Sequence, residues 1–277
     1  MPFADSFIST ETGVVPKRGK SGLTYRLFFS NIKNCWEILV SHNKATKRVA
    51  KMGFFKAYAL WFLLGIAAIA TFVWLFVFRK RLRMKWYAAL IISLLHIVVG
   101  VACVKLFAFL EAPGEPYDGA MSLFGAVFFM PVFYFIGAKI FKRDVRTVFD
   151  LFTVPLVFTL ACARVNCLIA GCCQGLVIHF IHSQTVQWPT REAELVFYAA
   201  FLTFAVIKTV KDETNGTLYP VYLISYGIFR FIVEWFRVTN HSFGPFHISH
   251  LWAILALIAG ASIYFEISPI FKKKKRG

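Results

Sequence analysis

The chain has 277 residues, of which 58% are hydrophobic and 18% aromatic, and its formal net charge is +17. Soluble domains average roughly 45–50% apolar residues. The surplus here lies in long uninterrupted runs, which excludes an ordinary water-soluble domain. The positive charge gathers in short blocks between those runs, so a membrane topology explains it better than a nucleic-acid-binding surface does.

Residues 1–53 are predicted to form a basic extension, separate from a membrane domain over residues 54–277. Residues 23–40 mix apolar side chains with Arg26, Lys33 and Glu37, so they are too polar to cross a bilayer. They favour an interfacial helix, and a solvated tail with one short helix is an equal alternative. The first 15 residues lack a basic start and an apolar core, so we expect no cleavable signal peptide.

Seven hydrophobic segments predict an all-α, polytopic integral membrane protein with about seven transmembrane helices. Three segments approach the ~20 apolar residues that a helix needs to cross a bilayer: 54–78, 86–104 and 119–138. The other four reach that length only together with neighbouring polar residues: 151–163, 195–207, 217–229 and 251–264.

The distribution of basic residues predicts the orientation. Basic clusters at residues 79–85 and 139–146 follow the first and third segments, and another at 272–276 closes the chain. Because cytoplasmic loops carry an excess of Lys and Arg, the C-terminus is expected in the cytoplasm. The basic residues before the first segment oppose this orientation, but three clusters outweigh one.

Arg164 lies near the end of the fourth hydrophobic segment. A charge at membrane depth is expensive and usually marks a function, so we interpret Arg164 as an anion-binding residue in the outer half of the membrane. The alternative is an arginine that extends its guanidinium to the membrane surface.

Cys167, Cys172 and Cys173 follow Arg164 in a glycine-flanked turn. No CxxC pair and no nearby histidine accompany them, so no zinc site is expected. They are either small packing residues or reactive thiols whose pKa the arginines lower. On the second interpretation Cys167 or Cys172 carries a lipid group covalently, and a strained Cys172–Cys173 disulfide is a further alternative.

Arg230, Glu234 and Arg237 are spaced i, i+4 and i+7, which places them on one face of a helix. They either form a self-satisfied ion triad or, together with Arg164, line a phosphate site with three guanidiniums and one carboxylate. The second interpretation predicts a phospholipid headgroup as ligand. Before the fifth segment, Thr190 is predicted to cap a helix whose first turn holds Glu192 and Glu194.

These motifs resemble those of the bacterial prolipoprotein diacylglyceryl transferases. The resemblance covers residues 54 to 270 in consistent order, and 226–237 (Tyr-Gly-x-x-Arg-Phe-x-x-Glu-x-x-Arg) is its most specific part. Residues 164–175 and 189–194 are similar to two further family motifs, and Asp150 is similar to an acidic residue that precedes the first of them. Tyr58 is similar to the tyrosine of the family's first helix, and 249–252 to the start of its last.

The resemblance implies seven membrane helices in the bacterial cytoplasmic membrane and transfer of diacylglycerol from phosphatidylglycerol to a prolipoprotein cysteine, without a metal or cofactor. Arg164 and Arg230 then hold phosphate, Glu234 and Arg237 support them, and Tyr58 faces the headgroup. Gly175 and Glu194 complete the expected substrate-binding residues.

The sequence departs from the family at four positions. Phe124 stands where the family has His or Tyr, Cys167 where it has Asn, Cys172 where it has a carboxylate, and Arg191 where it has Gln. Two alternatives follow. A diverged relative would transfer another lipid-derived group through its own thiols, and a non-catalytic protein would bind or transport phospholipid.

Overall fold

The computed structural model describes residues 58–111, 121–179, 185–237, 242–243 and 246–267. All of them belong to the second of two units, Lys56–Gly277. The predicted basic extension at 1–53 and the basic cluster at 272–276 lie outside the described residues.

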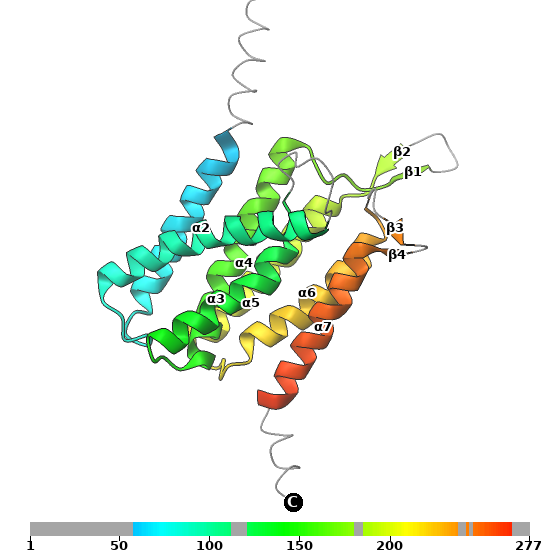
Figure 1. Ribbon diagram of the computed structural model, residues 1–277. Coiled ribbons are helices and arrows are strands. Elements are labelled where there is room, and N and C mark those ends of the chain that lie inside the picture. Colours follow the sequence, from blue (N-terminus) through cyan, green and yellow to red (C-terminus); the bar gives the residue numbers. More distant parts are fainter. Residues whose placement is uncertain (1–57, 112–120, 180–184, 238–241, 244–245, 268–277) are drawn as a thin grey trace, which may run out of the picture. The chain divides into compact units, whose positions relative to one another are not determined.

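Each of the seven predicted segments corresponds, over most of its described residues, to a helix of its own, which confirms the all-α, polytopic architecture (Figure 1). The first helix spans Tyr58–Val77. It is followed by α2 (Trp86–Glu111), α3 (Phe124–Ile140), α4 (Val145–Ala170), α5 (Thr190–Val210), α6 (Leu218–Glu234) and α7 (Ile248–Ile267). Five of these helices are long and apolar enough to cross a membrane, and α3 is a shorter apolar helix.

Two short antiparallel hairpins, which no sequence pattern predicted, join helices at one end of the bundle (Figure 1). Strand β1 (Val177–His179) pairs with β2 (Thr185–Gln187) between α4 and α5. Strand β3 (Ser242–Phe243) pairs with β4 (Phe246–His247) between α6 and α7.

Helix α4 is the central helix of the bundle. Its most apolar 18-residue window is 67% buried, whereas the corresponding windows of the other four long helices are 22–28% buried. The side chain of Asp144 begins α4 by accepting the amide N–H of Thr147 at 2.9 Å. Gly171 ends it in the left-handed conformation, with φ of 78°. The less buried helices direct large apolar side chains outward, as helices that face lipid do.

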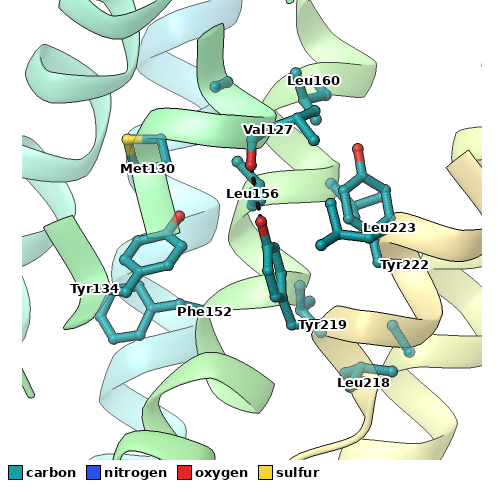
Figure 2. Close-up of a cluster of buried hydrophobic side chains, with 14 of the residues drawn as sticks. Val127, Met130, Tyr134, Phe152, Leu156, Leu160, Leu218, Tyr219, Tyr222 and Leu223 are labelled. Carbon is teal, nitrogen blue, oxygen red and sulfur yellow. Dashed lines mark hydrogen bonds between the residues drawn. The ribbon is translucent and has the colours of Figure 1, made fainter. Parts of the chain in front are cut away.

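Side chains of α3, α4 and α6 form the buried core in Figure 2. Tyr219 of α6 crosses to α3, where its hydroxyl donates to the carbonyl of Val127 at 2.8 Å. At the start of α6, the carboxylate of Asp150 accepts the amide N–H groups of Gly216 and Leu218 at 2.5 and 3.0 Å. The core thus fixes α6 against α4, and both helices carry arginines of the predicted site.

The predicted basic loops meet at the end of the bundle opposite the hairpins (Figure 1). Arg143 donates to the carbonyl of Arg83 at 3.0 Å, which joins the loop after α3 to the loop after the first helix. Arg81 lies 3.1 Å from Asp212, in the loop after α5. Helices that cross a membrane in alternate directions place every second loop on the same side, as these three loops are placed.

Candidate functional site

Four charged side chains from three helices meet inside the bundle. Glu194 of α5 pairs through one carboxylate oxygen with Arg164 of α4, and its other oxygen lies 2.6 Å from Nη1 of Arg230 on α6. Nη2 of Arg230 lies 2.8 Å from Glu234. Each of these side chains is at most 5% exposed. The structure therefore brings Arg164 and Arg230 together around a shared carboxylate.

Glu194 reaches this position because α5 buries one face. Thr190, Glu194 and Tyr198 are all buried and follow one another at intervals of one helical turn, whereas the side chain of Glu192 is 50% exposed. Of the two carboxylates predicted for the first turn, Glu192 faces outward and Glu194 faces the inside of the bundle. Glu194, expected from the family resemblance to bind substrate, instead pairs with Arg164 and Arg230 and adds a second carboxylate to the ion group.

The predicted helix cap at Thr190 is wrong. Pro189 occupies the N-cap position, and no side chain caps the helix. The hydroxyl of Thr190 instead donates to the carbonyl of Cys173 at 3.3 Å. It therefore connects the start of α5 to the cysteine-containing turn after α4.

The i, i+4, i+7 spacing predicted that Arg230, Glu234 and Arg237 share one helix face. This prediction is wrong for Arg237. Helix α6 ends at Glu234, and Arg237 forms an isolated antiparallel bridge with Gly175. Its Nη1 still lies 3.8 Å from a carboxylate oxygen of Glu234, and its Nη2 lies 3.1 Å from the sulfur of Cys173. Arg237 therefore joins the ion cluster to the cysteine-containing turn.

The turn places three thiols beside the arginines. Gly171 and Cys173 both adopt the left-handed conformation, with φ of 78° and 57°, and the sulfurs of Cys167, Cys172 and Cys173 lie within 4.8 Å of one another. All three cysteines are free thiols. Hydrogen bonds from Cys167 and Cys172, with the positive charge of Arg237, hold the pKa of the Cys173 thiol well below its usual value.

Gly175 fixes the distance between this turn and the start of α5. A methyl group on Gly175 would lie 2.2 Å from the carbonyl oxygen of Trp188, which is far inside van der Waals contact. The amide of Trp188 also donates to the carbonyl of Leu176 at 2.9 Å. Gly175, predicted to bind substrate, therefore lies where two backbone segments pack directly against each other.

Phe124 forms one wall of the ion cluster. Its ring centroid lies 5.6 Å from the guanidinium carbon of Arg230 and 5.8 Å from the ring of Tyr226. Phe124, which stands where the family has His or Tyr, thus presents an aromatic face to Arg230, and such a face attracts a cation.

Glu111, at the end of α2, lies within electrostatic range of Arg230 and Glu234. Glu111 is not among the residues predicted for the site, since no sequence motif links it to α6.

Several buried polar atoms around the cluster have no hydrogen-bond partner among the described residues. They are Glu234 Oε1, Arg230 Nε, Arg237 Nε, His250 Nε2 and the hydroxyls of Tyr198 and Tyr226. Buried polar groups are usually paired, so a group of unpaired ones requires an explanation. The ion pairs join three guanidiniums to two carboxylates, so the paired group by itself carries one net positive charge. Both features suit a polar, anionic ligand.

Tyr58 lies at the start of the first helix, and 55% of its surface is exposed. Further along this helix, Leu60 and Leu64 line a small apolar cavity together with Ala163, the residue before Arg164. The predicted contact of Tyr58 with the substrate headgroup stays a prediction.

Residues 49–266 match the family model for prolipoprotein diacylglyceryl transferase. The chain belongs to this family. Curated proteins named phosphatidylglycerol–prolipoprotein diacylglyceryl transferase include one from Dehalococcoides mccartyi (strain ATCC BAA-2100), which is 24% identical over 206 residues, covering 67% of this chain and 78% of the relative. A protein with the same name from Clostridium tetani is 25% identical over 126 residues, covering 42% of this chain and 51% of the relative. One from Clostridium perfringens, numbered 2, is 28% identical over 148 residues, covering 49% and 57%.

The match to the prolipoprotein diacylglyceryl transferase family includes all of the described residues except Ile267. Arg164, Glu194, Arg230 and Glu234 therefore all belong to the family domain. Phe124 and the three clustered cysteines also lie within it, so the substitutions noted in the sequence are changes inside the family's own fold.

Proposed function

We propose that this protein transfers the diacylglyceryl group of phosphatidylglycerol to the cysteine thiol of a prolipoprotein, the reaction named for its relatives. The observation that carries the proposal is the buried group of unpaired polar atoms around Arg164 and Arg230. This arrangement suits a phosphate that enters from the membrane, because guanidinium forks bind phosphate oxygens in pairs.

The proposed location is the bacterial cytoplasmic membrane, with the ion cluster in its outer half and the C-terminus in the cytoplasm. The basic loops support this orientation, since they gather at the bundle end opposite the cluster. A prolipoprotein presents its cysteine at the outer face of the cytoplasmic membrane. Donor and acceptor would therefore meet on the side of the membrane where the ion cluster lies.

The reaction is a displacement at the glyceryl carbon that carries the phosphate. The acceptor sulfur attacks this carbon, a carbon–sulfur bond forms, and the carbon–oxygen bond to phosphate breaks. The electron pair leaves with the oxygen, and glycerol phosphate departs with an additional negative charge. Arg164 and Arg230 stabilise the charge that develops on the phosphate, and Arg237 supports them. No electrons are exchanged with a third component, so the step itself requires no cofactor.

The thiol proton requires an acceptor, and we assign this role to Glu234. Its Oε2 pairs with Arg230, whereas its Oε1 has no partner among the described residues. When phosphate draws Arg230 toward itself, Glu234 loses part of its counter-charge and becomes a stronger base. Phe124 cannot accept a proton, whereas the His or Tyr of the family at this position could. In this protein Glu234 therefore accepts the thiol proton alone.

The predicted catalytic roles of Cys167 and Cys172 stay predictions. Nη1 of Arg164 lies 4.0 Å from the sulfur of Cys167, and the sulfur of Cys172 lies within 4.8 Å of that sulfur, so both thiols are near the proposed phosphate site. A diacylglyceryl thioether on either cysteine would be as stable as the product thioether. Direct transfer to the acceptor thiol is therefore the simpler path.

The proposal is tested with purified protein in vesicles that contain phosphatidylglycerol labelled in its headgroup, together with a lipobox peptide. We expect labelled glycerol phosphate and a diacylglyceryl peptide in equal amounts, and neither with a Cys→Ser peptide. Arg230→Lys keeps the positive charge but removes the paired N–H donors of the guanidinium, so it should reduce turnover by about 100-fold. Arg146→Lys, at the opposite end of the bundle, is the matched control.

Binding of phosphatidylglycerol without turnover by the folded protein would contradict the proposal and favour the non-catalytic phospholipid-binding alternative. Mass spectrometry of the intact protein provides a second measurement. A diacylglyceryl adduct on Cys167 or Cys172 that chases into the peptide would support those thiols as carriers and overturn direct transfer.

A further inference from the structure

We propose that Cys167, Cys172 and Cys173 form a three-coordinate binding site for a soft, thiophilic cation, with Cu(I) as its occupant. This site goes beyond the transferase reaction and does not depend on it. From the sequence no zinc site is expected, because the cysteines lack CxxC spacing and a nearby histidine. The fold brings them together by another route, through a turn that reverses after α4.

The first observation is the geometry of the sulfurs, which lie within 4.8 Å of one another. Metal–thiolate bonds are about 2.3 Å long, so three sulfurs around one ion in a plane lie about 4 Å apart. Small rotations of the side chains therefore suffice to place an ion between them.

The second observation is that the backbone around the thiols is held in place. Cys173 has φ of 57°, a conformation that a non-glycine residue adopts at some cost. Its carbonyl accepts the hydroxyl of Thr190, and the bridge between Gly175 and Arg237 holds the chain two residues further on. The conformation that directs Cys173 toward the other two thiols is thus supported from α5 and from the segment after α6.

The third observation concerns charge. A cysteine binds a metal as its thiolate, so each cysteine that is still protonated releases a proton to solvent on binding. Three thiolates around Cu(I) leave two negative charges. Arg237, with Nη2 at 3.1 Å from the sulfur of Cys173, and Arg164, with Nη1 at 4.0 Å from that of Cys167, offset part of this charge.

The ligand set favours Cu(I) over Zn(II). Thiolates select soft ions such as Cu(I), and Zn(II) in structural sites almost always takes four ligands. Among the described residues, no histidine or carboxylate belongs to the group of three sulfurs. Cys172 is exposed while Cys167 and Cys173 are partly buried, so an ion can enter from the side of Cys172.

The test is an anaerobic titration of the reduced, detergent-solubilised full chain with Cu(I) in competition with a chromogenic chelator. We expect one tightly bound equivalent, with three sulfur neighbours at about 2.3 Å by X-ray absorption. Cys167→Ser, Cys172→Ser and Cys173→Ser should each weaken binding by more than the roughly 10–100-fold that loss of a supporting residue costs.

Matched controls are Cys35→Ser, outside the described residues, and Cys103→Ser, in the core between helices, and both should bind Cu(I) as the unaltered chain does. Melting temperature in detergent shows that each variant is folded. The proposal is overturned if the Cys167/Cys172/Cys173 triple serine variant binds Cu(I) unchanged, if Zn(II) competes more strongly than Cu(I), or if a Cys172–Cys173 disulfide resists reduction and no ion binds.

Discussion

Arg230 of α6 donates to Glu194 of α5 across 2.6 Å, in a place where both side chains are 4% exposed. The two residues lie 36 positions apart in the sequence and on different helices. Glu194 also pairs with Arg164, so this one carboxylate holds both arginines of the proposed phosphate site in the absence of substrate.

Glu194→Gln should therefore destabilise the protein strongly. The amide preserves the shape of the side chain but removes the counter-charge of two buried guanidiniums, and breaking a buried ion pair costs about 3–5 kcal/mol. We also expect the activity of the remaining folded protein to fall, because the arginines would no longer be held in position. Unfolding in detergent and turnover per folded molecule measure the two effects.

Glu192→Gln is the matched control, since Glu192 lies two residues away on the same helix with its side chain 50% exposed. It should change stability by less than about 0.5 kcal/mol. Equal destabilisation by the two variants would mean that the buried ion cluster does not form.

A second prediction concerns Gly175→Ala. The added methyl group would lie 2.2 Å from the carbonyl oxygen of Trp188, so the two backbone segments would have to separate. We expect a loss of about 1–3 kcal/mol, typical of overpacking. Turnover should fall as well, because Arg237 forms a bridge with Gly175 and would move with it.

Gly137→Ala provides the comparison for this prediction. Gly137 lies inside α3, and a methyl group there would meet nothing within 4 Å. Because alanine is favoured over glycine in a helix by about 0.5–1 kcal/mol, this variant should be neutral or slightly more stable. If Gly175→Ala had the melting temperature and turnover of the unaltered protein, the turn that contains Gly175 would be free to shift.

The number and order of the helices could be predicted from the sequence because each helix needs its own apolar run to cross a bilayer. The exact ends could not. The segment predicted at 151–163 is a helix of 26 residues, since Asp144 and Gly171 set its limits through local hydrogen bonding and a left-handed turn. Hydropathy alone does not detect either signal.

The contents of the site were partly predictable. The helical spacing of Arg230 and Glu234 and the depth of Arg164 pointed to a shared ligand, and the structure places these residues together. The pairing of Glu194 with both arginines depends on how α5 packs against α4 and α6, which no local pattern encodes. The proximity of the three sulfurs likewise depends on left-handed residues at Gly171 and Cys173.

A third prediction separates structural from catalytic carboxylates. Asp150 is buried and accepts two amide N–H groups at the start of α6, far along α4 from Arg164. Asp150→Asn replaces one acceptor oxygen by an N–H donor that faces these amides. We expect a loss of about 1–3 kcal/mol, with turnover per folded molecule unchanged, measured by thermal unfolding and by the vesicle assay. A fall in turnover at full stability would instead place Asp150 in the reaction.

The last prediction concerns the ring of Phe124. Phe124→Leu removes the aromatic face next to Arg230 while it keeps most of the buried volume. A cation over an aromatic ring is stabilised by about 0.5–2 kcal/mol, so the kcat/KM of the Phe124→Leu variant should fall several-fold. Phe128→Leu is the matched control, because Phe128 lies one turn along α3 and stacks on Phe107 and Phe124. If the ring serves only to fill space, both variants should lose the same stability and keep the same kcat/KM.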